Sequence, residues 1–247
     1  MRREGFVQAD GAQIHFCAIG QGKPVVFLHG NGENYKVFRQ QAVYFKMNYR
    51  LVFIDSRGHG QSSMGKEDLN FDRMAEDVVR VLEHLKINKA AFVGFSDGAN
   101  LGINIALKYP SYVEKLAAVS GNINPHGMDN KFYYTIKGQY KVFDLLSKIH
   151  PFFNRKKQLY SLMLFHPRIS FGSLAEIKAP VLVVAGDRDM IKDSHTRAIA
   201  AAIPDARLKI IKDAGHMGIF NKADEYNQVI EEFLSGTEHF QKGTEEF

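Results

Sequence analysis

The sequence predicts an α/β protein with a mainly parallel, eight-stranded sheet that has helices on both faces. Strand-like apolar runs alternate with periodic, helix-like runs along most of the chain, which is typical of parallel strands joined by crossover helices. Most of the apolar runs contain few polar residues, as expected for strands that are covered on both faces. With 247 residues, the chain is long enough for one such domain with a large core.

The first two expected strands form a hairpin. Residues 6–9 and 14–18 flank Asp10-Gly11, a dipeptide that favours the positive φ angles of a tight turn. We therefore expect an antiparallel pair at one edge of the sheet. The helix-like pattern over residues 74–85 is typical of the segments that separate the later strands. Those strands are expected at residues 25–28, 51–54, 90–95, 116–120, 181–185 and 207–211.

This alternation breaks after residue 120, where about sixty residues replace an ordinary connection of a few residues. A segment of this length must fold. It is rich in aromatic residues, most of which we expect to pack the segment against the rest of the domain, with a few available to line a substrate pocket.

The pentapeptide Gly94-Phe95-Ser96-Asp97-Gly98 lies between a strand-like run and a helix-like run. This context predicts a nucleophile elbow, a strained turn that lifts a serine hydroxyl above the sheet. The two glycines leave room for the strand and the helix to approach each other. The pattern alone recurs by chance, and Ser96 could simply be a helix N-cap. The residues that follow downstream favour the nucleophile.

An acidic residue and a histidine follow Ser96 in the order Ser, acid, His. Asp187 and Asp189 lie in the loop after strand 181–185, and His216 lies in the loop after strand 207–211. The carboxyl ends of parallel strands meet at one edge of a sheet, so these side chains are expected near Ser96. This chain order is that of the α/β-hydrolase fold. Spacing alone leaves Asp187 as a competitor of Asp189.

On these residues the chain resembles the α/β-hydrolase superfamily, from its first strands to its last helix. His29-Gly30-Asn31-Gly32 and the stretch from Asp55 to Ser62 look like further family signatures. The resemblance implies the α/β-hydrolase fold and assigns the acid to Asp189, three residues after the glycine of its loop. It also implies a small helical cap, which we place at residues 122–172, with a core of residues 1–121 and 173–247.

The chemistry that this implies is acyl transfer to Ser96. His216 is expected to take the serine proton and return it to the leaving group, while Asp189 holds the imidazole in the useful tautomer. The backbone N–H groups of Asn31 and Asp97 are the expected oxyanion hole.

The side chain of Asp97 has two interpretations. Its charge can stabilise the start of the helix after the elbow, through the helix dipole. Alternatively, it can pair with a cationic group of the substrate, because Ser-Asp-Gly at this point resembles the aminoacyl-ester hydrolases of the valacyclovirase type.

Composition narrows the class of protein further. The net charge of +5 is modest and its densest run is only Arg155-Lys156-Lys157, so nucleic-acid binding is not expected. A single cysteine, Cys17, and the lack of a signal-peptide pattern or a membrane-spanning run lead us to expect a cytoplasmic protein. The polar residues 236–247 are expected to fray.

No metal or other cofactor is expected, because the sequence has no H-E-x-x-H motif and no paired cysteines. His29 and His59 are expected to brace loops beside the site. The predicted function is a serine hydrolase that cleaves a small-molecule carboxylic ester, or by the same chemistry a thioester or amide. The alternatives are a cofactor-free haloperoxidase, a C–C bond hydrolase or a lyase with the same triad, or a noncatalytic ligand receptor. The oligomeric state is left open.

Overall fold

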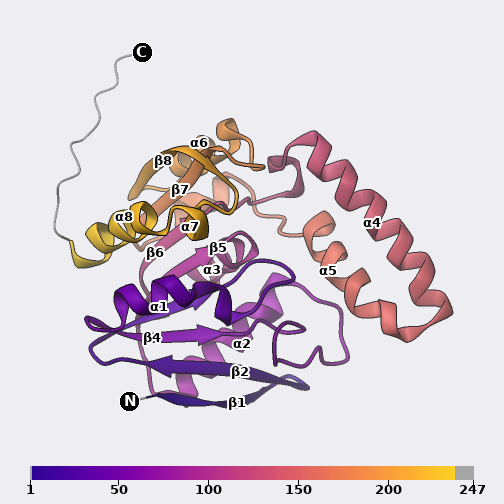
Figure 1. The fold of residues 1–247 in the computed structure, drawn as a ribbon, viewed down its shortest axis with the longest axis horizontal. Coiled ribbons are helices and arrows are strands. Elements are labelled where there is room, and N and C mark those ends of the chain that lie inside the picture. The colour runs from indigo at the N-terminus through magenta and orange to yellow at the C-terminus, as the bar shows by residue number, and fades with distance from the viewer. Residues whose placement is uncertain (1, 237–247) are drawn as a thin grey trace.

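The sheet predicted from the sequence is present and has eight strands in the order β1-β2-β4-β3-β5-β6-β7-β8 (Figure 1). The computed structural model describes residues 2–236, so the predicted fraying of the C-terminal residues falls almost wholly outside the described residues. The strands are β1 (Arg3–Ala9), β2 (Ala12–Ile19), β3 (Lys23–Leu28), β4 (Tyr49–Ile54), β5 (Ala90–Phe95), β6 (Val113–Val119), β7 (Val181–Arg188) and β8 (Ala206–Gly215).

The hairpin of β1 and β2 forms one edge of the sheet, as predicted. Its turn residues Asp10 and Gly11 have φ angles of 37° and 73°, the positive values that this dipeptide favours. Strand β1 pairs antiparallel with β2, and β2 pairs antiparallel with β4. Every later pairing is parallel, so the carboxyl ends of β3 to β8 lie at the same edge of the sheet.

The helices of the core cover both faces of the sheet (Figure 1). They are α1 (Arg39–Phe45), α2 (Phe71–His84), α3 (Asp97–Lys108), α6 (Asp193–Ala202), α7 (Gly218–Asn221) and α8 (Ala223–Ser235), with a 3-10 turn η1 (Tyr35–Phe38) before α1 and η2 (Pro110–Tyr112) before β6. Alternate strand residues point to opposite faces, which produces two apolar cores. Val26 and Leu28 of β3 face the core that includes α2 and α3, whereas Val25 and Phe27 face the core that includes α1 and α8.

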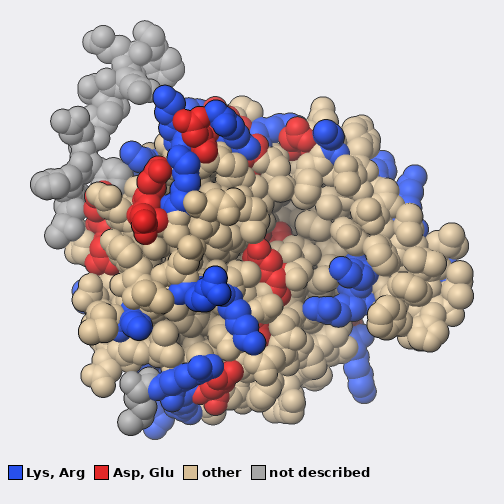
Figure 2. All heavy atoms as spheres, in the orientation of Figure 1, with Lys and Arg blue, Asp and Glu red and all other residues tan. Residues whose placement is uncertain are grey.

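The long interval between β6 and β7 is helical. It contains η3 (Pro125–Gly127), α4 (Asn130–Ile149), η4 (Pro151–Phe153), α5 (Asn154–Phe165) and η5 (Gly172–Glu176). Helices α4 and α5 pack against each other and lie to one side of the sheet (Figure 1). On the face in view, Figure 2 shows Lys and Arg side chains along the upper edge and the inner part of this helical segment, while its outer end is largely uncharged.

No helix within residues 2–236 combines the length and the apolar character needed to cross a membrane.

Candidate active site

Ser96 lies in a sharp turn between β5 and α3. Its φ angle is 53° and its ψ angle is −119°, a backbone conformation that is strained for a residue with a β-carbon. The flanking glycines permit the turn: a β-carbon on Gly94 would lie 2.2 Å from the carbonyl oxygen of Gly98, and one on Gly98 would lie 1.9 Å from that of Leu28. The backbone thus has the geometry of a nucleophile elbow.

The structure brings His216 and Asp189 to Ser96. Nε2 of His216 lies 3.0 Å from the Ser96 hydroxyl oxygen, and Nδ1 lies 2.8 Å from Oδ1 of Asp189. Asp187 does not join them: its side chain is exposed and accepts the backbone N–H of Ala214 at 3.2 Å. Of the two aspartates in this loop, Asp189 is therefore the one placed to orient the imidazole.

The environment keeps Asp189 ionised. Burial alone would raise the pKa of this carboxyl, but the hydrogen bond from His216, its positive charge when protonated and the N–H of Ile191 outweigh burial and lower the pKa. A carboxylate at this distance favours the tautomer with a proton on Nδ1, which leaves Nε2 free to accept a proton from Ser96. The arrangement can therefore activate an alcohol for attack on a carbonyl carbon.

Asn31 lies in the loop after β3, and Asp97 follows Ser96 as the first residue of α3. Within residues 2–236, no hydrogen-bond acceptor is found for the backbone N–H of either residue. Their side chains bond each other, because Nδ2 of Asn31 donates to Oδ2 of Asp97 at 2.8 Å. Asn100 donates to the other oxygen of Asp97 at 3.1 Å and also to Asn122, which extends this chain of amides to the residues after β6.

Two buried histidines help to hold the loops beside the site. Nε2 of His29 accepts the N–H of Ser56 at 3.0 Å, and Nδ1 donates to the carbonyl of Gly30 at 2.7 Å. Such a ring must be neutral, and burial accordingly lowers the pKa of His29 to about 4. The ring of His59 packs against it, with 5.2 Å between the ring centroids. The loops after β3 and β4 are thereby tied together.

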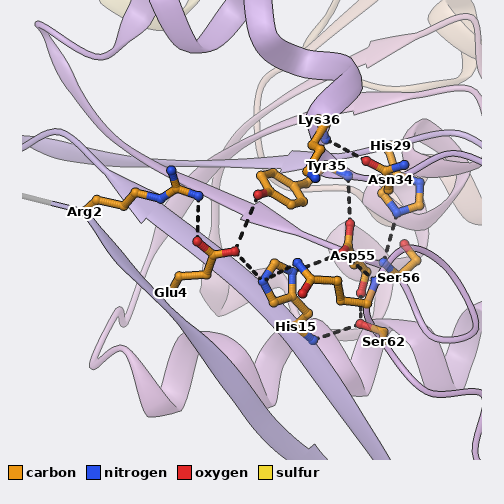
Figure 3. Close-up of polar contacts among 11 residues, drawn as sticks. Arg2, Glu4, His15, His29, Asn34, Tyr35, Lys36, Asp55, Ser56 and Ser62 are labelled. Atoms are coloured by element: carbon orange, nitrogen blue, oxygen red, sulfur yellow. Dashed lines mark hydrogen bonds and ion pairs between the residues drawn. The ribbon is translucent and has the colours of Figure 1, made fainter.

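A second tie, shown in Figure 3, is centred on the buried Asp55 at the end of β4. Its carboxylate accepts the backbone N–H of Tyr35 at 2.7 Å and that of Gln61 at 2.9 Å, and it bonds Nδ1 of His15 at 3.0 Å. Nε2 of His15 in turn meets Glu4 at 3.0 Å. The loop that carries Asn31 therefore has its far end fixed to two other strands.

A cavity of about 330 Å³ opens beside Ser96 and His216. Much of its wall is apolar and comes from the helical segment and the loop after β7, including Met128, Phe132, Leu159, Tyr160, Met163 and Ile191. Its volume is within the range of small-molecule sites.

The cavity wall includes one acidic residue that sequence reasoning missed, Glu33. Its carboxylate accepts the N–H of Gly30 at 2.9 Å, and burial raises its pKa. Burial also raises the pKa of Asp97, whose carboxylate lines the same cavity. Glu33 lies three residues after Gly30 in the turn, but no pattern distinguished it from a solvent-exposed loop glutamate. Among residues 2–236, no group of three or more His, Cys, Asp or Glu side chains could hold a metal ion.

The chain is similar to hydrolases among the known proteins. Human serine hydrolase BPHL is 27% identical over 92% of this chain and 85% of its own length. The 2-hydroxy-6-oxo-6-phenylhexa-2,4-dienoate hydrolase of Comamonas testosteroni is 26% identical over 90% of this chain and 91% of its own length. The solved structure of Est816, described as an N-acyl homoserine lactone degrading enzyme, has a TM-score of 0.77 and 26% identity, and covers 93% of this chain and 100% of its own. Residues 23–146 match the family model described as the alpha/beta hydrolase fold, and the chain belongs to that family.

Proposed function

We propose that the protein is a serine hydrolase that cleaves a carboxylic ester through an acyl-serine intermediate. The observation that carries this proposal is the continuous path from Oδ1 of Asp189 through both ring nitrogens of His216 to the Ser96 hydroxyl, with distances of 2.8 and 3.0 Å. A serine hydroxyl is a weak nucleophile at neutral pH and needs such a base.

In the proposed reaction, Ser96 attacks the ester carbonyl while Nε2 of His216 takes its proton. The oxygen of the tetrahedral intermediate becomes negative and accepts hydrogen bonds from the backbone N–H groups of Asn31 and Asp97. His216 then donates its proton to the leaving alcohol, and the acyl group stays on Ser96. Water repeats the sequence to release the acid, with His216 again acting as base and then as acid.

In this proposal the helical segment between β6 and β7, residues 122–172, is a cap that covers the active site. Support comes from the cavity wall, to which both α4 and α5 contribute side chains such as Phe132 and Tyr160. The small volume and largely apolar wall favour an ester with a short or medium acyl group.

A fluorophosphonate probe tests the nucleophile, and a panel of p-nitrophenyl esters of increasing acyl length tests the reaction. We expect the parent to be labelled and to hydrolyse the shorter esters, and Ser96→Ala to lose both properties without a change in melting temperature. An unlabelled parent would favour a noncatalytic receptor. Labelling without turnover of any ester would favour a different reaction on the same residues, such as hydrolysis of a C–C bond.

A second candidate is an ester whose acyl group carries an amine. Glu33 and Asp97 both line the cavity, and neither forms an ion pair with a basic side chain in the part of the chain that the structure describes. Two carboxylates of this kind favour a cationic ligand, because a positive charge offsets the cost of burying them.

Asp97→Asn and Glu33→Gln separate the two candidates. Each variant is assayed on an aminoacyl ester and on a neutral ester of matched size. If the amine is recognised, kcat/KM falls at least about ten-fold more for the aminoacyl ester, the usual effect of losing one ion pair in a binding site. An equal effect on both esters would leave the neutral ester as the substrate class.

A further inference from the structure

Helix α4 is apolar on two sides. Its inner side packs on α5 through aromatic side chains: the rings of Phe143 and Tyr160 stack at 5.5 Å, and those of Tyr140 and Phe165 meet edge to face at 5.2 Å. These contacts account for the packing of α4 in the domain. They do not account for the other side of the helix.

The outer side of α4 bears a stripe of exposed apolar side chains. The exposed fractions are 66% for Tyr134, 53% for Val142, 62% for Leu145 and 73% for Ile149. Their spacing of three, four or eight residues puts them on one face of the helix. Phe152, just beyond the helix, is 77% exposed and extends the line of apolar residues in the sequence. Single exposed apolar residues are ordinary, but a stripe along one helix face is typical of a binding surface.

Lysines border this outer stripe. Lys141 and Lys148 lie about two and about four helical turns after Tyr134, which puts them along one edge of the stripe. Lys137 lies with its Nζ 6.0 Å from the ring centroid of Tyr134. Within residues 2–236, neither Lys137 nor Lys141 has an acidic side chain at ion-pair distance, whereas Lys148 pairs with Asp144 at 3.2 Å.

The charge of the whole segment is one-sided. Residues 122–172 contain eight Lys and Arg but only two Asp and no Glu, while the entire chain has a net charge of +5. The positive excess of the protein therefore resides in this segment, and the rest of the chain is close to neutral. Figure 2 shows basic side chains at the upper edge and the inner part of the segment on the face in view.

We propose that the outer stripe of α4 and its lysines dock the protein on the surface of a membrane that contains anionic lipids. An amphipathic helix that lies in the membrane interface combines an apolar face, which enters the headgroup region, with lysines at its border. Anionic headgroups complement the excess charge of the segment. A second copy of this chain complements it poorly, because a symmetric contact through this face would bring two positive segments together.

Docking through α4 is independent of the reaction proposed for Ser96, and it can be measured without any substrate. The full chain is mixed with sedimenting vesicles of phosphatidylcholine alone or of phosphatidylcholine with phosphatidylglycerol, and the bound fraction is measured in the pellet. We expect binding to the anionic vesicles, weaker binding as salt is raised, and at least about a ten-fold lower partition coefficient on the neutral vesicles.

The apolar part of the proposal is tested by the double variant Leu145→Glu/Ile149→Glu. Its matched control is Val43→Glu/Met47→Glu, which places the same new charges on the α/β domain, away from α4. Val43 is 63% exposed and Met47 is 80% exposed. We expect the α4 variant to lose on the order of ten-fold or more in partition, and to lose more than the control does.

The charged part is tested by Lys137→Glu/Lys141→Glu, with Lys66→Glu/Lys89→Glu as a control of equal charge change at exposed positions of the core. Each basic residue at an anionic surface contributes about five-fold to partition, so the α4 variant is expected to bind at least about 25-fold more weakly than the parent. Circular dichroism and the melting temperature establish that each variant is folded.

Three results would overturn the proposal. They are no binding of the parent to anionic vesicles, equal losses in the α4 variants and their controls, and a dimer in sedimentation velocity that Leu145→Glu/Ile149→Glu dissociates. The last result would assign the stripe to a second copy of the chain.

Discussion

His195 of α6 makes the stability of the fold depend on pH. The ring is buried, and its Nε2 accepts the backbone N–H of Ile123, at the start of the helical segment, at 3.2 Å. Burial, aided by the positive charge of Lys192, lowers the pKa of His195 from 6.5 to about 4. In the unfolded chain the ring takes up a proton as the pH falls below its ordinary pKa, whereas in the folded protein it stays neutral until about pH 4.

Acid therefore favours the unfolded state, because that state binds the proton first. Because the pKa is about 4 in the folded state and 6.5 in the unfolded state, the free energy of unfolding falls by about 2 kcal/mol between pH 7 and pH 5. The loss continues to about pH 4 and then levels off. His29 and His59, whose pKa values burial lowers to about 4 and about 3, add to the total in the same direction.

His195→Gln isolates this contribution, because the glutamine oxygen can take the place of Nε2 as acceptor for Ile123 but does not titrate. Urea unfolding of the parent and the variant is followed at pH 7 and at pH 5. We expect the parent to lose about 2 kcal/mol more than the variant over this interval, since His29 and His59 titrate in both proteins and their contributions cancel. Identical losses in the two proteins would refute the assignment of a proton-linked role to His195.

Two further predictions concern the loop after β7 and the glycines. Asp189→Asn should lower kcat for ester hydrolysis on the order of 10⁴-fold, because it favours the wrong imidazole tautomer of His216. The kcat of Asp187→Asn should stay within about three-fold of the parent value. Similar losses of kcat in steady-state assays of both variants would contradict the placement of His216. Gly138→Ala should raise the free energy of unfolding by roughly 0.5–1 kcal/mol, because the added β-carbon enters open space on an exposed helix face. Gly98→Ala should lower the free energy of unfolding by about 3 kcal/mol or more, because its β-carbon would overlap the main chain. If chemical denaturation gave both changes the same sign, the close approach at the elbow would be contradicted.

The strands and the elbow could be predicted because their signals are local. A run such as Phe92-Val93 before Gly94 reports burial on both faces, and the hairpin turn at Asp10-Gly11 depends on the preference of two residues. The order of Ser96, the acid and His216 added a constraint from the topology of parallel strands. The choice of Asp189 over Asp187 came from a family resemblance, and the hydrogen bond to His216 agrees with it.

Other features depend on contacts between distant residues, which spacing does not encode. Asn100 meets Asn122 across 22 positions, and nothing near either residue indicates an amide chain. Glu33 enters the cavity wall only because the turn after Gly30 folds back on itself. The outer stripe of α4 was unforeseen for a different reason: the aromatic richness of the segment predicts packing, but the sequence does not say which apolar face is covered.

The backbone at Ser96 has one more implication. A left-handed conformation that is comfortable for glycine costs a residue with a β-carbon on the order of 1 kcal/mol or more, so Ser96→Gly is expected to melt at a higher temperature than the parent. Folding by itself would thus select glycine at the tip of the elbow. The serine side chain therefore lowers the stability of the fold at a position where glycine would be favoured. This cost distinguishes Ser96 from serines at unstrained surface positions.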